Sequence, residues 1–88
     1  MIAYRVVTTT SGEEWFHEAA AADAAVAGQL GVDPSVIESL RRCVTADPVV
    51  IRRDGARWRS RQIWNVRSGA MNVRIYEMLK VDETAYDH

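Results

Sequence analysis

The residues that decide the fold run from Val49 to Val81 and read VVIRRDGARWRSRQIWNVRSGAMNVRIYEMLKV. They contain three runs rich in β-branched and aromatic residues, separated by Asp54-Gly55 and by Ser68-Gly69-Ala70-Met71. An Asp-Gly pair between such runs is one of the strongest short-range signals for a β-hairpin. The stretch therefore predicts an antiparallel meander of three strands.

The alternation of side chains along a strand assigns the meander residues to two faces. With Asp54 and Gly55 at the centre of the turn, Ile51 is expected to oppose Trp58. The face expected to join a core takes Ile51, Trp58, Trp64, Val66, Val73, Ile75, Leu79 and Val81. The opposite face, expected to be cationic, takes Arg52, Arg57, Arg59, Arg61, Arg67, Arg74, Tyr76 and Lys80.

Length and composition indicate one small globular domain. The 88 residues are 48% hydrophobic and 26% charged, which is enough apolar material for a single core. The formal net charge of −1 conceals an uneven distribution: residues 1–40 hold one arginine and six acidic residues, whereas residues 41–80 hold ten arginines or lysines and three acidic residues. The meander is therefore expected to carry a positive field of its own.

The residues before the meander predict one strand and two helices. Ile2 to Thr9 is rich in β-branched residues and reads as a strand. Ser11-Gly-Glu-Glu14 fits a capping box and predicts a helix start. The apolar stripe of this first predicted helix comprises Trp15, Ala19, Ala22, Val26 and Leu30, and Gly31 is expected to cap the C-terminal end of the helix. Asp33-Pro34 predicts a second helix that continues to Asp47-Pro48.

The expected architecture is thus a single α+β domain over residues 1–88, in the order β-α-α-β-β-β. Two helices pack on one face of a mostly antiparallel sheet, and residues 81–88 form a flexible acidic tail. We expect one core that buries Trp15, Val26, Leu30, Ile37, Leu40, Trp58, Trp64, Val73 and Ile75 together.

Several classes of function have no support in the sequence. Cys43 is the only cysteine and the histidines are His17 and His88, so no zinc-ligand spacing exists and neither a metal nor a cofactor is expected. A single cysteine and the absence of a signal-peptide pattern favour the cytoplasm. The Ala-rich stretch 19–27 is too short to cross a bilayer, so no membrane partner is expected.

The predicted cationic face points to an anionic partner. No acidic residue offsets its arginines, and the planar guanidinium fork suits phosphate. Tyr76 would add a surface on which a base could stack. Nucleic acid, RNA or DNA, is the first expectation. An acidic protein would attract the same arginines, as in a small phage-type inhibitor or adaptor, and a plain solvated sheet face would also look charged.

The layout also resembles the RelE/ParE toxin superfamily, whose catalytic members are small ribonucleases that act on ribosome-bound messenger RNA. The residues that carry the resemblance are Trp64-Asn-Val-Arg67-Ser-Gly69 followed by Arg74-Ile-Tyr76-Glu. It implies that Arg67 and Arg74 steady phosphate, that Arg59 or Arg61 adds charge at the transition state, and that an antitoxin-like partner exists; a homodimer is also compatible. The final catalytic segment of that family is reduced here to residues 84–88.

Catalysis is the weaker part of this resemblance. RNA cleavage needs a group that takes a proton from the 2′-hydroxyl, and the candidates are Tyr76, Glu77 and His88. By the resemblance, Tyr86 and His88 would be remnants of the family's final segment. Arg74 and Tyr76 are the candidate catalytic residues of a RelE-like endoribonuclease. Because arginine is a poor base, we expect binding rather than cleavage.

A second partial resemblance covers residues 26–41. Val26-Ala27, Leu30-Gly31-Val32, Ser35, Ile37 and Leu40-Arg41 follow the spacing of a helix-turn-helix in small DNA-binding regulators. This alternative would place the helix that starts at Asp33 against DNA. The carboxylates of Asp33 and Glu38 would then face phosphates, which argues against it.

Overall fold

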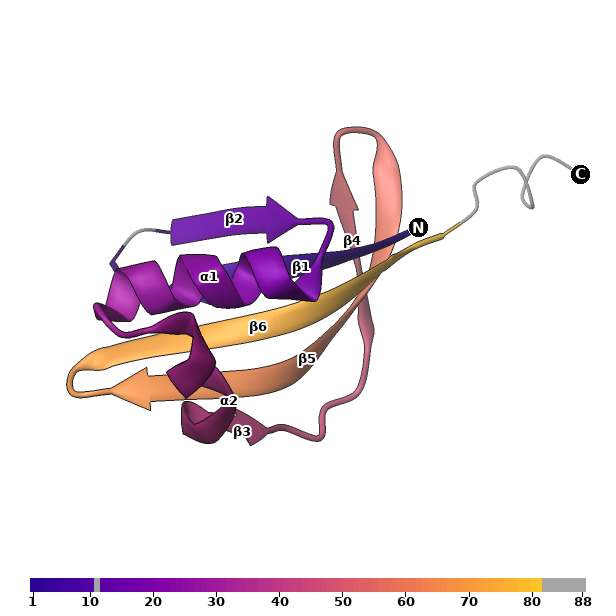
Figure 1. Cartoon of the computed structure of the whole chain (residues 1–88). Coiled ribbons are helices and arrows are strands. Elements are labelled where there is room, and N and C mark those ends of the chain that lie inside the picture. Colours follow the sequence, from indigo (N-terminus) through magenta and orange to yellow (C-terminus); the bar gives the residue numbers. More distant parts are fainter. Residues whose placement is uncertain (11, 82–88) are drawn as a thin grey trace, which may run out of the picture.

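Residues 1–10 and 12–81 are described by the computed structural model. Two helices cover one face of an antiparallel sheet in one small α+β domain, as predicted, and the sheet has six strands where three or four were expected (Figure 1). The elements in chain order are β1 (Ile2–Thr8), β2 (Gly12–Phe16), α1 (Ala19–Leu30), the 3-10 turn η1 (Pro34–Val36), α2 (Ile37–Leu40), β3 (Arg41–Cys43), β4 (Val49–Arg53), β5 (Ala56–Ser68) and β6 (Met71–Lys80).

Every strand pairing is antiparallel, and the strand order is β2-β1-β6-β5-β3. Strand β4 also pairs with β5, along residues 56–60, whereas β3 pairs along residues 64–66. The long strands β5 and β6 therefore form the spine of the sheet. The β4–β5 hairpin extends past the region that the helices cover (Figure 1).

The predicted β4–β5 hairpin and its register are confirmed. Asp54 and Gly55 both have positive φ, 53° and 78°, as a type I′ turn requires at its two central positions. Ile51 opposes Trp58. The turn chemistry read from the sequence therefore places this pair correctly.

The helix start predicted at Ser11–Glu14 is wrong. Gly12–Phe16 forms β2, which pairs with β1 so that Trp15 opposes Arg5. Strand pairing satisfies these backbone groups and half-buries Trp15, a gain that outweighs the local capping pattern. Ser11 itself lies outside the described residues, and α1 begins at Ala19.

The second helix begins as predicted but ends early. The Ser35 amide donates to Asp33 Oδ1 at 2.9 Å, so Asp33 is the N-cap. Beyond Leu40, however, residues 41–43 form β3 against β5. The guanidinium of Arg41 lies 3.9 Å from the Trp64 ring centroid and forms an ion pair with Asp23 at 3.3 Å, so tertiary contacts hold this segment on the sheet.

A β-bulge in β5 interrupts the regular alternation of side chains between the two faces of the sheet. The ladder between β5 and β6 shifts register between Gln62 and Trp64, which makes Ile63 the extra residue. Residues directly opposite in an antiparallel ladder share a face, and Trp58 opposes Lys80 whereas Trp64 opposes Ile75. Because Lys80 and Ile75 are an odd number of residues apart on β6, Trp58 and Trp64 lie on opposite faces. The single core face predicted for the meander is therefore wrong.

We call the side of the sheet that carries Val73 and Ile75 the helix face, and the side that carries Arg74 and Met78 the open face. The main core lies between the helix face and the helices, and its buried residues are Val6, Ala22, Val26, Ala27, Ile37, Val66, Val73 and Ile75. Leu30, Leu40 and Trp64 pack against it as expected.

A second, smaller core lies on the open face. Ala3, Met78 and Trp58 form it, and Trp15 packs against them. Trp15 and Trp58 were expected in the main core, so this part of the prediction is wrong. Leu79, also expected to be buried, is 41% exposed on the helix face beyond the helices. In the described part of the chain, no helix has the length and apolarity needed to span a membrane.

Candidate nucleic-acid interface

The bulge separates the residues that were expected to form one cationic face. Arg59 opposes Leu79 and Arg61 opposes Glu77, which places both on the helix face. The full set divides equally: Arg52, Arg57, Arg59 and Arg61 lie on the helix face beyond the helices, whereas Arg67, Arg74, Tyr76 and Lys80 lie on the open face. The continuous arginine surface predicted from regular alternation does not exist.

A compact group of arginines does form on the open face, and we call Arg42, Arg67 and Arg74 the basic patch. Arg42 on β3 and Arg74 on β6 both oppose Asn65 on β5, so Arg42, Asn65 and Arg74 lie in one row across three strands. Arg67 is two residues from Asn65 on the same face of β5. Strands about 4.8 Å apart bring these side chains within reach of one ligand.

The charges of the basic patch are not neutralised within the described chain. All three side chains belong to exposed residues, and none forms an ion pair or hydrogen bond with a described residue. The neighbouring polar side chains are the amides of Asn65 and Asn72, which carry no charge. Guanidinium groups in this arrangement offer bidentate donors to phosphate without first breaking an internal ion pair.

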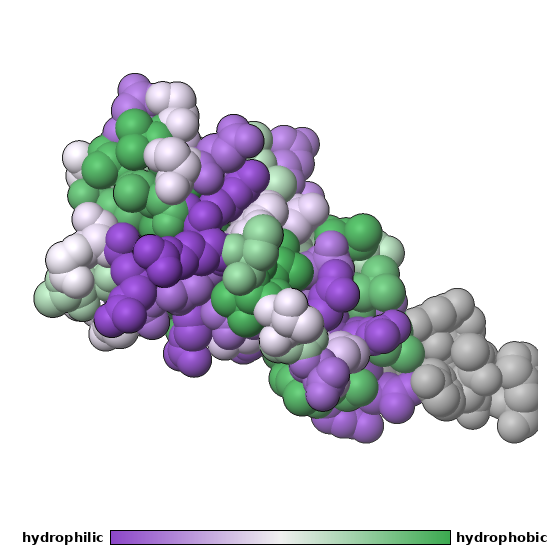
Figure 2. All heavy atoms as spheres, turned by 90° about the horizontal axis from the view of Figure 1, so that it is seen from below, coloured by the Kyte–Doolittle hydropathy of each residue, from purple (hydrophilic) through white to green (hydrophobic). Residues whose placement is uncertain are grey.

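A hollow adjoins the basic patch. It has a volume of about 270 Å³ and is lined by Ser39, Leu40, Arg42, Asn65 and Arg67. Seen from below, strongly hydrophilic groups gather at the end of the sheet that carries α2 and β3 (Figure 2). The patch is thus an indented polar surface at this end of the molecule.

Tyr76, expected to provide a stacking surface, is instead partly covered. The guanidinium of Arg5 lies 4.3 Å from the centroid of its ring. Arg5 also forms an ion pair with Glu13 at 3.0 Å. Tyr76 therefore positions a cation on the open face, and one side of its ring is occupied.

Glu13 is held on the open face by two neighbours. Trp15 Nε1 donates a hydrogen bond to Glu13 Oε1 at 3.0 Å, and Arg5 Nη1 donates to Oε2 at 3.0 Å. The hydrogen bond from Trp15 and then the positive charge of Arg5 lower the pKa of Glu13, although partial burial opposes them. This carboxylate therefore serves to fix Arg5 and Trp15 in place.

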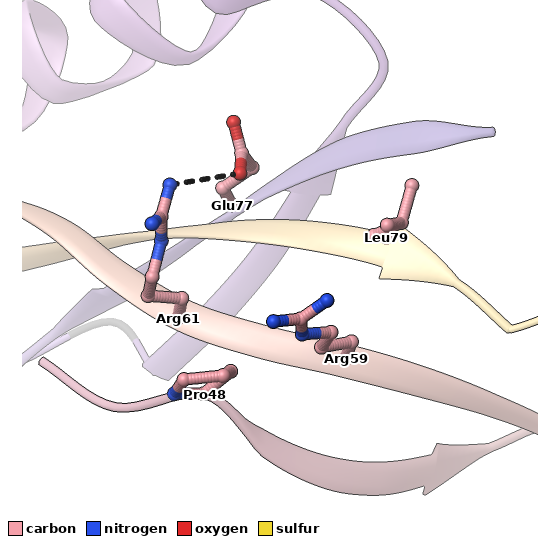
Figure 3. Close-up of a pocket in the computed structure, with 5 residues that line it drawn as sticks. All are labelled: Pro48, Arg59, Arg61, Glu77 and Leu79. Carbon is pink, nitrogen blue, oxygen red and sulfur yellow. Dashed lines mark hydrogen bonds and ion pairs between the residues drawn. The ribbon is translucent and has the colours of Figure 1, made fainter.

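Two of the helix-face arginines border a different, smaller pocket of about 160 Å³, which is lined by Pro48, Arg59, Arg61, Glu77 and Leu79. Arg61 turns to Glu77, with Nη2 to Oε1 at 3.3 Å, whereas Arg59 lies between Arg61 and Leu79 (Figure 3). The RelE/ParE resemblance implied that Arg59 or Arg61 acts on the same phosphate as Arg67 and Arg74. The two pairs lie on opposite faces of the sheet, so they cannot do so.

Among the residues that the structure describes, the open face has cations suited to phosphate but no well-placed base. Arg74 and Tyr76 lie two residues apart on this face. The carboxylate on the neighbouring strands, Glu13, is already bound by Arg5 and Trp15, and Glu77 lies on the helix face. Tyr86 and His88 lie outside the described residues. Among the described residues, no group of three metal-ligating side chains occurs.

The helix pair at residues 26–41 differs from a DNA-reading unit. The second helix ends at Leu40, and Ile37 is fully buried in the main core. Asp33 and Glu38 are exposed. A duplex approaching this pair would therefore meet carboxylates before it met Arg41, which is paired with Asp23.

The sequence-based reasoning missed Arg42 and Arg5. Arg42 was assigned to a helix, and its place on the sheet depends on the β3–β5 ladder, which has no local signal in a three-residue segment. Arg5 could have been found, because it lies on the alternating strand β1, but the pairing of β1 with β6 was needed to place it beside Tyr76.

Comparisons with protein-family models, curated proteins and solved structures find no match. The RelE/ParE resemblance therefore stays a prediction.

Proposed function

We propose that this protein binds single-stranded nucleic acid through the open face of its sheet. The observation that carries the proposal is the basic patch: Arg42, Arg67 and Arg74 lie together, exposed, with no carboxylate among the described residues to neutralise them. Phosphate contacts of this kind supply most of the affinity of sequence-independent binding.

The shape of the open face favours a single strand over a duplex. A broad antiparallel sheet presents successive side chains to unpaired nucleotides, as in other sheet-based RNA readers. On the open face, β6 carries a cation at each end of a stretch of about 20 Å, Arg74 and Lys80, at about 3.4 Å per residue, and Arg5 lies between them over Tyr76. Such a track supports contact with several consecutive phosphates.

The proposal is for binding without cleavage. Strand scission would need a proton acceptor next to Arg74, and Glu13 is bound by Arg5 and Trp15. A RelE-like ribonuclease activity would therefore depend on a group outside the described residues.

Fluorescence anisotropy with a short labelled single strand tests the proposal. Arg67→Gln/Arg74→Gln removes two patch charges and keeps two of the three methylenes of each arginine stem, so folding should be preserved. Its matched control is Arg52→Gln/Arg59→Gln, which removes the same charge from the helix face. The patch variant should reduce the salt slope of log K by about 1.4, because each phosphate contact on a single strand contributes about 0.7.

Equal effects of the two double variants would overturn the open-face proposal, because affinity would then follow total charge. Absence of any salt-dependent binding to single-stranded RNA or DNA would overturn nucleic-acid binding altogether. Tighter binding to duplex than to single strand would contradict the argument from the shape of the sheet.

A second candidate partner, an acidic protein segment, is favoured by the helix face beyond the helices. There Ile2, Leu79 and Val50 are 47%, 41% and 60% exposed, and Arg59 lies between Leu79 and Val50 in the ladder. An apolar row beside an arginine that forms no ion pair with a described residue suits a partner that carries both carboxylates and apolar side chains. For this partner, Arg52→Gln/Arg59→Gln should weaken binding and the patch variant should not, as measured by calorimetry with an acidic, leucine-containing peptide.

A further inference from the structure

An aromatic pocket of about 320 Å³ opens on the open face, at the opposite end of the sheet from the basic patch. Trp15 and Trp58 form its corner, with ring centroids 5.1 Å apart and ring planes inclined by 70°. Ala3 and Ala56 also line it, and their small side chains leave space beside the rings. The volume lies at the lower end of the roughly 300–1,000 Å³ typical of ligand sites, which suits one planar ring system.

Cationic side chains surround this aromatic corner. The guanidinium of Arg53 lies 4.2 Å from the centroid of Trp15, and Lys80 opposes Trp58 in the β5–β6 ladder. His17 also lines the pocket. Among the described residues that line it, the one carboxylate is Asp54, which is 90% exposed and already lies 3.7 Å from Arg53 Nε. The pocket therefore combines an apolar aromatic wall with a positive rim.

We propose that this pocket takes one nucleotide of a bound single strand, with the base against the part of Trp15 that Arg53 leaves uncovered and against the exposed 9% of Trp58, and with its phosphate at Lys80 and Arg53. The inference rests on the proposed function, because Arg74, Tyr76 and Lys80 alternate along the same face of β6 and lead from the basic patch to the pocket. Aromatic walls accept any base, since every base has a π-face, and Lys80 supplies the charge that a phosphate needs.

Tryptophan fluorescence gives a direct test on the full chain. The protein has three tryptophans, and Trp64 lies on the helix face beneath Arg41. A Trp64→Phe background therefore restricts the signal to the two pocket tryptophans. The probes are adenosine 5′-monophosphate, adenosine and inorganic phosphate, each titrated to about 10 mM, well above the roughly 1 mM Kd expected for one stacked base with one charged contact.

Adenosine monophosphate should quench the signal saturably, adenosine should bind more weakly, and phosphate alone should leave the signal unchanged. Lys80→Gln should weaken the nucleotide by roughly tenfold, as expected for loss of a charge-assisted contact. Arg59→Gln removes the same charge from the helix face and should have no effect. Lys80 is exposed, so this comparison holds even if a substitution of Trp15 or Trp58 disturbs folding.

The outcomes separate this inference from the proposed function. Strand binding that depends on Arg67 and Arg74, without quenching by the mononucleotide, would overturn the pocket and leave the open-face proposal intact. Quenching without strand binding would make the pocket a mononucleotide site and overturn its role as part of a strand-binding surface. Equal effects of Lys80→Gln and Arg59→Gln would also overturn it.

Discussion

Trp58 and Trp64 lie on the same strand at an even spacing, yet they pack on opposite faces of the sheet. Trp58 contacts Trp15 in the open-face core, whereas Trp64 packs against the main core beneath the helices. The extra residue Ile63 causes this reversal. One inserted residue therefore decides which arginines share a surface, since it also sends Arg59 and Arg67 to opposite faces.

Deletion of Ile63 should leave the protein folded with the same face assignment, because Gln62 and Trp64 would then be consecutive residues opposite Tyr76 and Ile75 in a regular ladder. Trp58 would stay on the open face and Trp64 on the helix face. The deletion removes the contacts of a partly buried side chain, so some stability is lost. Near-ultraviolet circular dichroism and a cooperative urea transition should both be retained. The control is Ile63→Val, which keeps the bulge and should cost only about 0.5–1.5 kcal/mol in the free energy of unfolding. Loss of the cooperative transition in the deletion variant would show that the bulge is essential.

Met78→Ala should destabilise the protein by about 2–5 kcal/mol, the usual cost of truncating a buried methionine. Met78 is fully buried in the open-face core although no helix covers that face. The adjacent residue Leu79 is 41% exposed, so Leu79→Ala should change the free energy of unfolding by less than about 0.5 kcal/mol. Urea unfolding of the two variants gives the comparison. Equal losses would mean that the open face has no core of its own.

Gly55→Ala should lower stability by about 1–2 kcal/mol, because Gly55 has φ 78° and a Cβ makes the left-handed region unfavourable. Asp54→Gly serves as the matched change at the neighbouring position, where φ is 53°. Glycine adopts that conformation readily, so Asp54→Gly should be close to neutral. Thermal unfolding followed by circular dichroism measures both variants. A neutral Gly55→Ala would show that the turn can change type.

Stability should fall at acidic pH partly through Glu13. The hydrogen bond from Trp15 and the charge of Arg5 lower its pKa in the folded protein below the ordinary value of 4.5. A lowered folded pKa contributes stability that is fully present above 4.5 and is lost as the pH falls through the folded value. Glu13→Gln should therefore be less stable than the parent at pH 7, and the difference should shrink below pH 4.5.

Urea titrations of the parent and Glu13→Gln across this pH range isolate the contribution of Glu13. Asp33, whose pKa is lowered by the backbone amide of Ser35, titrates in both proteins and cancels in the difference. A difference that does not change with pH would mean that Trp15 and Arg5 do not discriminate between the two protonation states of Glu13.

Local signals in the sequence were sufficient for the β4–β5 turn, for two of the helix caps and for the class of fold. Asp54-Gly55 set the β4–β5 register, Asp33 capped the second helix, and Gly31, with φ 70°, ended the first. These features depend on residues within a few positions of one another, so propensity and hydrogen-bonding chemistry determine them. The packing of both helices on one face agrees with the apolar residues assigned to their buried sides, of which Ala22, Val26 and Ile37 lie in the main core.

Tertiary structure decided which side chains share a surface. Gly12–Phe16 forms a strand because its backbone pairs with the edge of β1. Residues 41–43 are not helical because their backbone pairs with β5. The bulge at Ile63 has no sequence signature, since an apolar residue between Gln62 and Trp64 fits either a regular or a bulged strand. When side chains are assigned to faces by alternation, a shift of one residue reverses the face assigned to every later residue of the strand. The arginines were therefore predictable as residues of the sheet, but the arrangement of Arg42, Arg67 and Arg74 in one patch required the long-range ladders of β3, β5 and β6.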